Sequence, residues 1–267
     1  MSSRSARIHR GYVDTSVGQI HFREAGRGDG TPIVMLHQTA SCGVMFEPLM
    51  AELEDEFRMV APDVPGFGMS DRPAEAGNMP LYARAIHEAL QALGIRSCWL
   101  FGVHSGAAVA VELEARHPGT ARRLVLSGPP FANDDMRALV AEQAKPFVIR
   151  EDGGHLLEIW ARIRAKDPGA PLEWAHTECV NNLHAGPRWH EAYLATVRCD
   201  FNTLLPGIAC PTLLMAGDTD SLRSSLEPAH AALPTARKIV LPDATTYLCV
   251  RRAAAVAGIL RGFFQPG

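Results

Sequence analysis

The stretch from Ser97 to Pro118 constrains the fold of this chain more than any other. An apolar run over Ser97–Phe101 favours a buried strand, and the alanine- and valine-rich segment Gly106–Arg116 favours a helix that Pro118 ends. Only a few residues separate the two elements, so the chain must bend sharply between them. The sequence therefore predicts a strand that passes through a tight turn directly into a helix.

The small residues of this turn indicate which side chain it presents. A sharp bend leaves no room for a Cβ on either side of its central residue, and Gly102 and Gly106 flank His104 at matching distances. Centring the turn on Ser105 would place Val103 in a flanking position, where its branched side chain fits poorly. We therefore expect the turn to lift His104 above the edge of the sheet.

The rest of the chain alternates between strand-like and helix-like segments, which favours a mostly parallel sheet covered by helices. A hairpin is expected at one edge, from Arg7–Val13 and Gln19–Glu24. Further strands are expected at Thr31–Leu36, Phe57–Asp63, Ala121–Ser127 and Ala236–Pro242, and a strand followed by a turn is expected at Pro211–Asp220.

Residues 131–203 break this alternation. They hold no strand-like run, and helices are expected at Asp134–Lys145, His155–Lys166, Leu172–His184 and Arg188–Arg198. We therefore expect a core made of residues 1–130 and 204–267, with an inserted helical unit at 131–203.

Composition limits the partners and cofactors of the protein. The 267 residues carry a formal charge of −3, from 26 Lys and Arg against 29 Asp and Glu, so no nucleic-acid-binding face is expected. The six cysteines form no C-x-x-C pair, and neither a metal site nor a disulfide framework is expected. The first residues lack the apolar core of a secretory signal and no membrane-spanning run follows, so we expect a cytoplasmic protein that acts on a small molecule. The oligomeric state stays open.

Three motifs together resemble the α/β-hydrolase superfamily over nearly the whole chain. They are the turn at Gly102–Gly106, the stretch Asp63–Asp71 with its D-x-x-G-x-G-x-S pattern, and the strand and G-x-x-D turn at Pro211–Asp220. The resemblance implies an α/β fold with a mostly parallel eight-stranded sheet, helices on both faces and an inserted helical cap. It also implies an enzyme that needs no cofactor.

The same resemblance assigns the catalytic positions, and two of them hold unusual residues. The nucleophile position of the elbow falls on His104, and the acid position falls on Asp220. The position that usually holds the catalytic histidine falls on Thr246. The backbone N–H groups of Gln38 and Ser105 fall at the oxyanion hole, with Gln38 in the place of a glycine. Substrate-binding candidates are His37, Phe131, Phe147, Trp160, Trp189 and Tyr247.

Three functions remain compatible with these positions. In the first, His104 acts as base or nucleophile in hydrolysis, C–C or C–O cleavage, or proton transfer on a small carbonyl compound. A neutral imidazole suits this role, and the helix N-terminus should lower the pKa of His104 unless Asp220 reverses that shift. In the second, Ser105 acts as the nucleophile of an esterase or lactonase and borrows a histidine from the cap, since threonine cannot remove its proton. In the third, the protein binds a ligand without catalysis.

Overall fold

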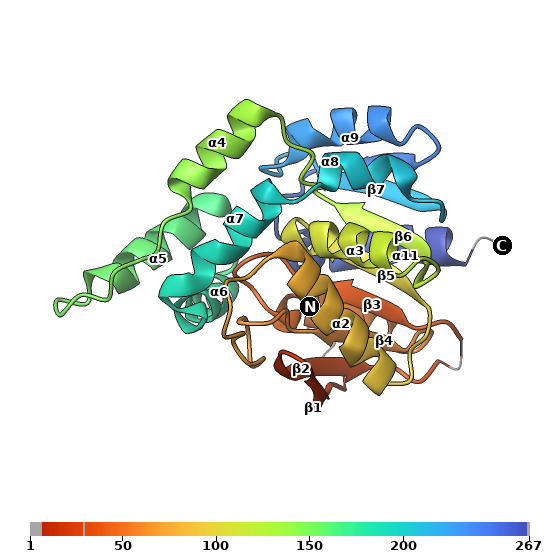
Figure 1. The fold of residues 1–267 in the computed structure, drawn as a ribbon, viewed down its shortest axis with the longest axis horizontal. Helices are drawn as coiled ribbons and strands as arrows, with labels where there is room; N and C mark the ends of the chain where they lie inside the picture. Colours follow the sequence, from red (N-terminus) through yellow and green to blue (C-terminus); the bar gives the residue numbers. More distant parts are fainter. Residues whose placement is uncertain (1–6, 29, 266–267) are drawn as a thin grey trace.

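A single sheet of eight strands forms the centre of the computed structural model, which describes residues 7–28 and 30–265 (Figure 1). The strand order is β1-β2-β4-β3-β5-β6-β7-β8. The pairs β1/β2 and β2/β4 are antiparallel, and every other neighbouring pair is parallel. This confirms the predicted mostly parallel sheet with a hairpin at one edge.

The strands are β1 (His9–Thr15), β2 (Gly18–Ala25), β3 (Ile33–Leu36), β4 (Met59–Pro62), β5 (Cys98–Val103), β6 (Ala121–Ser127), β7 (Thr212–Gly217) and β8 (Arg237–Leu241). The helices are α1 (Glu47–Leu53), α2 (Met79–Ala92), α3 (Ser105–Arg116), α4 (Asp134–Gln143), α5 (Gly154–Lys166), α6 (Leu172–Ala185), α7 (His190–Arg198), α8 (Phe201–Leu204), α9 (Leu226–Ala232), α10 (Leu248–Arg251) and α11 (Ala253–Phe264). Short 3-10 turns lie at Gly43–Phe46, Pro187–Trp189, Leu205–Gly207 and Arg223–Ser225.

The alternation of side chains along the strands builds two separate cores. In β3, Val34 and Leu36 pack with α2 and α3 on one face, whereas Ile33 and Met35 pack with α1 and α11 on the other. Successive residues of a strand point to opposite faces, so a strand covered on both sides must be apolar throughout. All four residues of β3 are accordingly fully buried.

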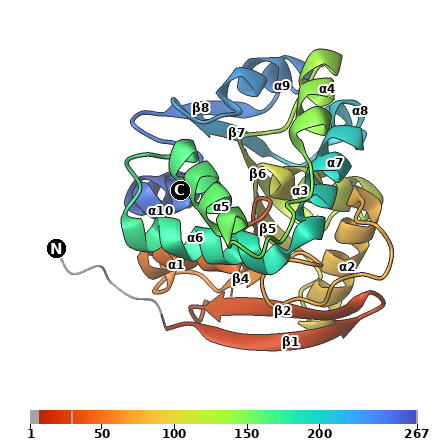
Figure 2. The same cartoon turned by 90° about the vertical axis from the view of Figure 1, so that its left-hand side faces the viewer.

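Helices α4 to α7 lie between β6 and β7 in the sequence and stand at one end of the sheet, where the figures show them projecting from the core (Figures 1 and 2). We call them the cap helices. Helices α5 and α6 share a small apolar cluster of their own, made by Ile159, Ile163, Ala175 and Cys179. The expected helical insert, with four helices near the expected positions, is thus present.

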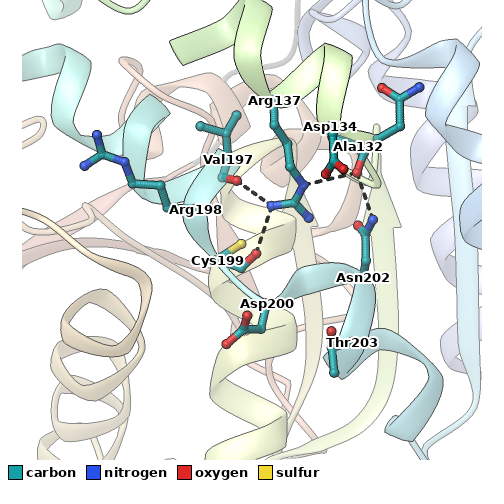
Figure 3. A pocket seen from close by; sticks show the side chains of 10 residues that line it. Ala132, Asp134, Arg137, Val197, Arg198, Cys199, Asp200, Asn202 and Thr203 are labelled. Carbon is teal, nitrogen blue, oxygen red and sulfur yellow. Dashed lines mark hydrogen bonds between the residues drawn. The ribbon is translucent and has the colours of Figure 1, made fainter.

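Arg137 links, through hydrogen bonds, the chain segment before α4 to the segment after α7, where the cap helices join the core (Figure 3). Its guanidinium donates hydrogen bonds to the carbonyls of Ala132, Val197 and Cys199, and Asn202 donates to the same Ala132 carbonyl at 2.8 Å. These residues line a surface pocket of about 430 Å³. The Arg137 guanidinium and the Asn202 amide nitrogen of this pocket therefore hold the base of the cap.

Candidate active site

The turn between β5 and α3 is centred on His104. His104 adopts φ 51° and ψ −113°, and Asp243 is the other described non-glycine residue with a positive φ. A Cβ at Gly102 would lie 2.5 Å from the Gly106 carbonyl oxygen, and one at Gly106 would lie 2.1 Å from the Leu36 carbonyl oxygen. The two flanking glycines are thus required by the close approach of backbone to backbone. The bend holds the histidine in a backbone conformation that an L-residue adopts only when its surroundings enforce it.

His104 forms a direct pair with Asp220. Its Nε2 lies 2.9 Å from Oδ1 and 3.0 Å from Oδ2 of the carboxylate. The Asp220 side chain is fully buried, whereas that of His104 keeps 14% of its surface exposed. Asp220 also accepts a hydrogen bond from the Leu222 N–H at 2.7 Å. The resemblance placed these two residues in the site, and the structure brings them into contact.

The charge state of Asp220 determines which nitrogen of His104 is available. Burial by itself would raise the pKa of Asp220, but the charge and hydrogen bond of His104 outweigh it, and the pKa falls below its ordinary value of 3.8. An ionised carboxylate only accepts hydrogen bonds, so Nε2 must carry the proton. In the neutral imidazole, Nδ1 then holds a free lone pair. Within residues 7–28 and 30–265, Nδ1 makes no hydrogen bond.

Gly128, which directly follows β6, is a part of the site that the sequence analysis missed. It has a φ of +57°, and a Cβ there would lie 2.4 Å from Cδ2 and 2.5 Å from Nε2 of His104. Any side chain at this position would displace the imidazole from Asp220. The only signal in the sequence was the position of Gly128 after the strand that neighbours β5.

Replacing Gly128 by alanine is expected to lower turnover about a hundredfold, because a reacting group displaced by about 1 Å loses that much rate. The matched control is Gly119→Ala, since Gly119 also has a positive φ, of +88°, but a Cβ added there would meet no atom within 4 Å. Both variants should lose stability in thermal unfolding because of their positive φ, and Gly128→Ala should lose more because its Cβ also meets His104. A similar loss of turnover in both would show that His104 does not depend on the space at Gly128.

Thr246 lies in the loop before α10 and is 5% exposed. Its hydroxyl is 3.5 Å from the Ser221 hydroxyl, which belongs to the residue after Asp220. Among the described residues, the Asp220 carboxylate is hydrogen-bonded by His104 and Leu222. Thr246 therefore contacts the residue next to Asp220. The imidazole that contacts Asp220, however, belongs to His104 in the turn between β5 and α3.

Ser105 directs its hydroxyl toward the loop after β3. Its Oγ accepts hydrogen bonds from the Thr39 N–H at 2.7 Å and from the Thr39 hydroxyl at 2.8 Å. It borders a cavity of about 10 Å³, lined mainly by apolar side chains such as Val64 and Phe67. Both acceptor positions of this oxygen are occupied, and no basic side chain in the described part of the chain forms a hydrogen bond with it.

The cap histidines are not placed to activate Ser105. His176 and His184 are exposed. His155 accepts a hydrogen bond from the Arg150 N–H, and His190 bonds to the Pro187 carbonyl. None of the four has a hydrogen bond to Ser105 among the residues described.

His37 supports the loop that carries Gln38. Its Nδ1 donates to the Gln38 carbonyl at 2.9 Å, and its Nε2 accepts from the Val64 N–H at 2.9 Å. Burial lowers the pKa of His37, which favours the neutral ring that this pattern requires. Both ring nitrogens of His37 thus form hydrogen bonds with backbone groups, and neither is available to a ligand in front of His104.

Gln38 is 2% exposed, and its backbone N–H has no backbone acceptor in the described ranges. The N–H of Ser105 is in the first turn of α3, where an intrahelical acceptor is absent by geometry. These two N–H groups suit an oxyanion hole next to the elbow. The amide oxygen and nitrogen of the Gln38 side chain are also buried without hydrogen-bond partners.

The predicted substrate-binding aromatics fall into two groups. Trp189 and Tyr247 are buried, 7% and 0% exposed, and each makes an edge contact with another aromatic ring. Phe147 and Trp160 pack against the apolar cluster within the cap helices, while Phe131 packs against Phe201. The first group packs into the two main cores, and the second into the cap and its base.

Neither a metal centre nor a membrane-spanning helix is found within residues 7–28 and 30–265. No group of three or more His, Cys, Asp or Glu side chains there could hold a metal ion. None of the helices in that part of the chain has the length and apolar character needed to cross a membrane.

Similar proteins place this geometry in a family. Over 131 residues the chain is 30% identical to haloalkane dehalogenase 2 of Mycobacterium bovis, a match that covers 49% of this chain and 45% of that protein. It is 25% identical to 2-(acetamidomethylene)succinate hydrolase of Mesorhizobium japonicum over 245 residues, covering 87% of each. The crystal structure of an E-2-(acetamidomethylene)succinate hydrolase superposes with a TM-score of 0.80 and 22% identity, covering 97% of this chain and 99% of the other.

The match to the dehalogenase spans less than half of that protein, so it shows relationship rather than a shared activity. The model of the α/β hydrolase fold family, in contrast, matches residues 31–250, which include the elbow, the cap helices and Asp220. With the eight-stranded sheet and the elbow that the structure shows, this match establishes that the chain belongs to the α/β-hydrolase fold family.

Proposed function

We propose that this protein is an enzyme that hydrolyses a small carbonyl compound, an ester or lactone, with the His104 and Asp220 pair as its general base. The observation that carries the proposal is the contact of Nε2 with the buried carboxylate of Asp220, at 2.9 Å, which leaves Nδ1 unpartnered among the described residues. An imidazole oriented by a carboxylate is the usual arrangement of a catalytic base.

The proposed reaction uses groups already placed at the elbow. Nδ1 of His104 takes a proton from a water molecule as the water oxygen attacks the substrate carbonyl carbon. The N–H groups of Gln38 and Ser105 stabilise the negative charge that develops on the carbonyl oxygen. When the tetrahedral intermediate collapses, the leaving oxygen takes the proton back from the imidazolium. Asp220 stays ionised throughout and stabilises the transient imidazolium.

Two further considerations support hydrolysis under a cap. The relatives with printed activities include hydrolases such as 2-(acetamidomethylene)succinate hydrolase and the 2-hydroxymuconate semialdehyde hydrolase of a Pseudomonas strain. Residues 131–203, as the cap unit, would cover the substrate in a protein that works in the cytoplasm. The alternative with Ser105 as nucleophile is less well supported, because the Ser105 oxygen already accepts two hydrogen bonds and lacks a neighbouring base.

The decisive experiment is a screen for proton release at constant pH with simple aryl esters, enol esters and lactones. The wild-type protein and a folded His104→Ala variant are compared on every compound. Turnover that requires His104 supports the proposal and supplies a substrate for the later tests. Turnover that is unchanged in His104→Ala, or a ligand that binds without being converted by any preparation, would contradict it.

A conventional histidine at position 246 should not by itself create an esterase. Thr246→His is expected to leave aryl ester hydrolysis within about threefold of the wild-type rate, since the elbow position still lacks a hydroxyl nucleophile. The double variant His104→Ser with Thr246→His should hydrolyse the same esters faster, because it restores a serine, a base and Asp220. Fast turnover by the single variant would identify Ser105 as the nucleophile.

A further inference from the structure

A group of buried and half-buried polar side chains lies between the cap helices and the loop after β3. We call Gln38, Arg162, Lys166, Glu178 and Tyr193 the polar cap cluster. Arg162 and Lys166 come from α5, Glu178 from α6 and Tyr193 from α7. Glu178 and Tyr193 contact the loop after β3 directly, and Lys166 lies beside Tyr193. Figure 2 shows α5 and α6 in front of one end of the sheet.

Direct contacts join the cluster to the proposed oxyanion hole. The Tyr193 hydroxyl donates to the Thr39 carbonyl at 3.1 Å, and the Lys166 ammonium lies 3.5 Å from the same hydroxyl. Thr39 is also the residue whose N–H binds Ser105. Glu178 accepts a hydrogen bond from the Ser41 hydroxyl at 2.8 Å. The cluster therefore adjoins the position that a substrate carbonyl would occupy.

The cluster and its neighbours contain many buried polar atoms without partners. Gln38 is 2% exposed and Glu178 is 0% exposed, yet both amide atoms of the former and one carboxyl oxygen of the latter form no hydrogen bond of normal geometry, although the two side chains lie close enough to interact with each other. Tyr247, also 0% exposed, has an unpartnered hydroxyl. Buried polar groups in folded proteins are nearly always paired. Side-chain nitrogen atoms of Arg162, Trp174, Asn181 and Trp189 are likewise buried without a hydrogen-bond partner.

The cationic groups of the cluster form no close ion pair in the described part of the chain, although the charge of Lys166 acts on the Glu178 carboxyl. Among the described residues, no carboxylate oxygen lies within 4.0 Å of the guanidinium of Arg162 or the ammonium of Lys166. Arg162 makes one hydrogen bond, to Asn182 at 2.8 Å, and stacks over the Trp189 ring at 4.0 Å. A guanidinium has five N–H donors, so most of them remain available. Asp167, the sequence neighbour of Lys166, is paired with Arg251.

Glu178 is the one acidic member of the cluster. Its carboxyl is fully buried, and burial raises its pKa, against the opposing effects of Lys166 and of hydrogen bonding to Ser41. The cluster thus contains two cationic side chains for one carboxyl group, an arrangement complementary to a small anion.

We propose that the polar cap cluster binds the carboxylate of the substrate, with Lys166 and Arg162 as its cationic contacts, so that the enzyme acts on a carboxylate-bearing ester or lactone. This assignment rests on the proposed function for the reacting carbonyl, which lies over His104. Tyr193 and Gln38 lie between this carboxylate subsite and the reacting carbonyl. Tyr193 donates a hydrogen bond to Thr39, and Gln38 precedes Thr39 in the chain.

The test measures binding by calorimetry, with succinate as the probe, succinamide as its uncharged counterpart and inorganic phosphate as a second anion. The wild-type protein should bind succinate in a one-to-one ratio, bind phosphate more weakly and give no heat with succinamide. Lys166→Gln and Arg162→Gln should each weaken succinate binding at least tenfold. Lys145→Gln, which removes an exposed lysine near the end of α4, is the matched control and should bind as the wild type does.

Each outcome has a distinct meaning. Succinate affinity that is unchanged in both Lys166→Gln and Arg162→Gln would assign any binding to an adventitious anion site and overturn the proposal, as would an absence of succinate binding. Tighter binding of phosphate than of succinate would overturn the carboxylate assignment. His104→Ala should still bind succinate. If it binds succinate and the wild type shows no His104-dependent turnover, the proposed function fails while the anion subsite stands.

Discussion

Replacing His104 by alanine is expected to lower kcat at least a hundredfold while the protein stays folded. General-base assistance is typically worth about 10² to 10⁴ in rate, and the variant loses the only imidazole that contacts Asp220 in the described structure. KM should change little, because in the proposed mechanism the cap and the N–H groups of Gln38 and Ser105 hold the substrate. The measurement is kcat and KM on the substrate found by proton release, with circular dichroism as the check on folding.

The matched comparison for this variant is Ser105→Ala. Ser105 contributes its backbone N–H, which alanine keeps, and its hydroxyl contacts Thr39 rather than His104. We expect kcat to fall less than tenfold, through small movements of the Thr39 loop. The reverse ranking, with Ser105→Ala inactive and His104→Ala active, would restore a serine mechanism and remove His104 from the chemistry.

Replacing Asp220 by asparagine is expected to lower kcat by about 10² to 10⁴, although position 104 keeps its imidazole. A neutral amide does not stabilise the imidazolium, and it can donate to Nε2, which moves the ring proton to Nδ1. Nδ1 of His104, which faces the substrate, would then carry the proton and could not accept one from water. Asp200→Asn removes a carboxylate that is exposed, and this control should retain wild-type turnover.

The same variant should change how stability depends on pH. The pKa of Asp220 is lower in the folded protein than its ordinary value of 3.8, so its ionised form favours folding. That contribution is complete above about pH 4 and is lost as pH falls through the lower folded-state pKa. Asp220→Asn should therefore be less stable at neutral pH and should lose less stability on acidification. Urea unfolding at pH 7 and pH 3 measures both effects, and equal acid sensitivity of the two proteins would contradict the pairing.

Local sequence patterns were sufficient to predict the sheet, the cap helices and the elbow. The continuous apolar run of β3 requires cover on both faces, and Gly102 and Gly106 locate a bend that no other residue type would permit. These features depend on neighbours within a few positions along the chain. Element ends were predicted less well, as with β1, which begins at His9 rather than at Arg7. Strand ends depend on which partner residues are present across the sheet.

The tertiary structure decided how the site residues meet. His104 and Asp220 are 116 positions apart, and only the parallel arrangement of β5, β6 and β7 brings the ends of their strands together. The space left by Gly128 and the contact of Glu178 with Ser41, 137 positions away, likewise have no local signature. By itself, the sequence determined that the chain forms an α/β-hydrolase fold with a histidine at the elbow, because backbone geometry and apolar periodicity are local. Which groups face that histidine follows from long-range packing, because side chains distant in the chain become neighbours only when the sheet and the cap close around them.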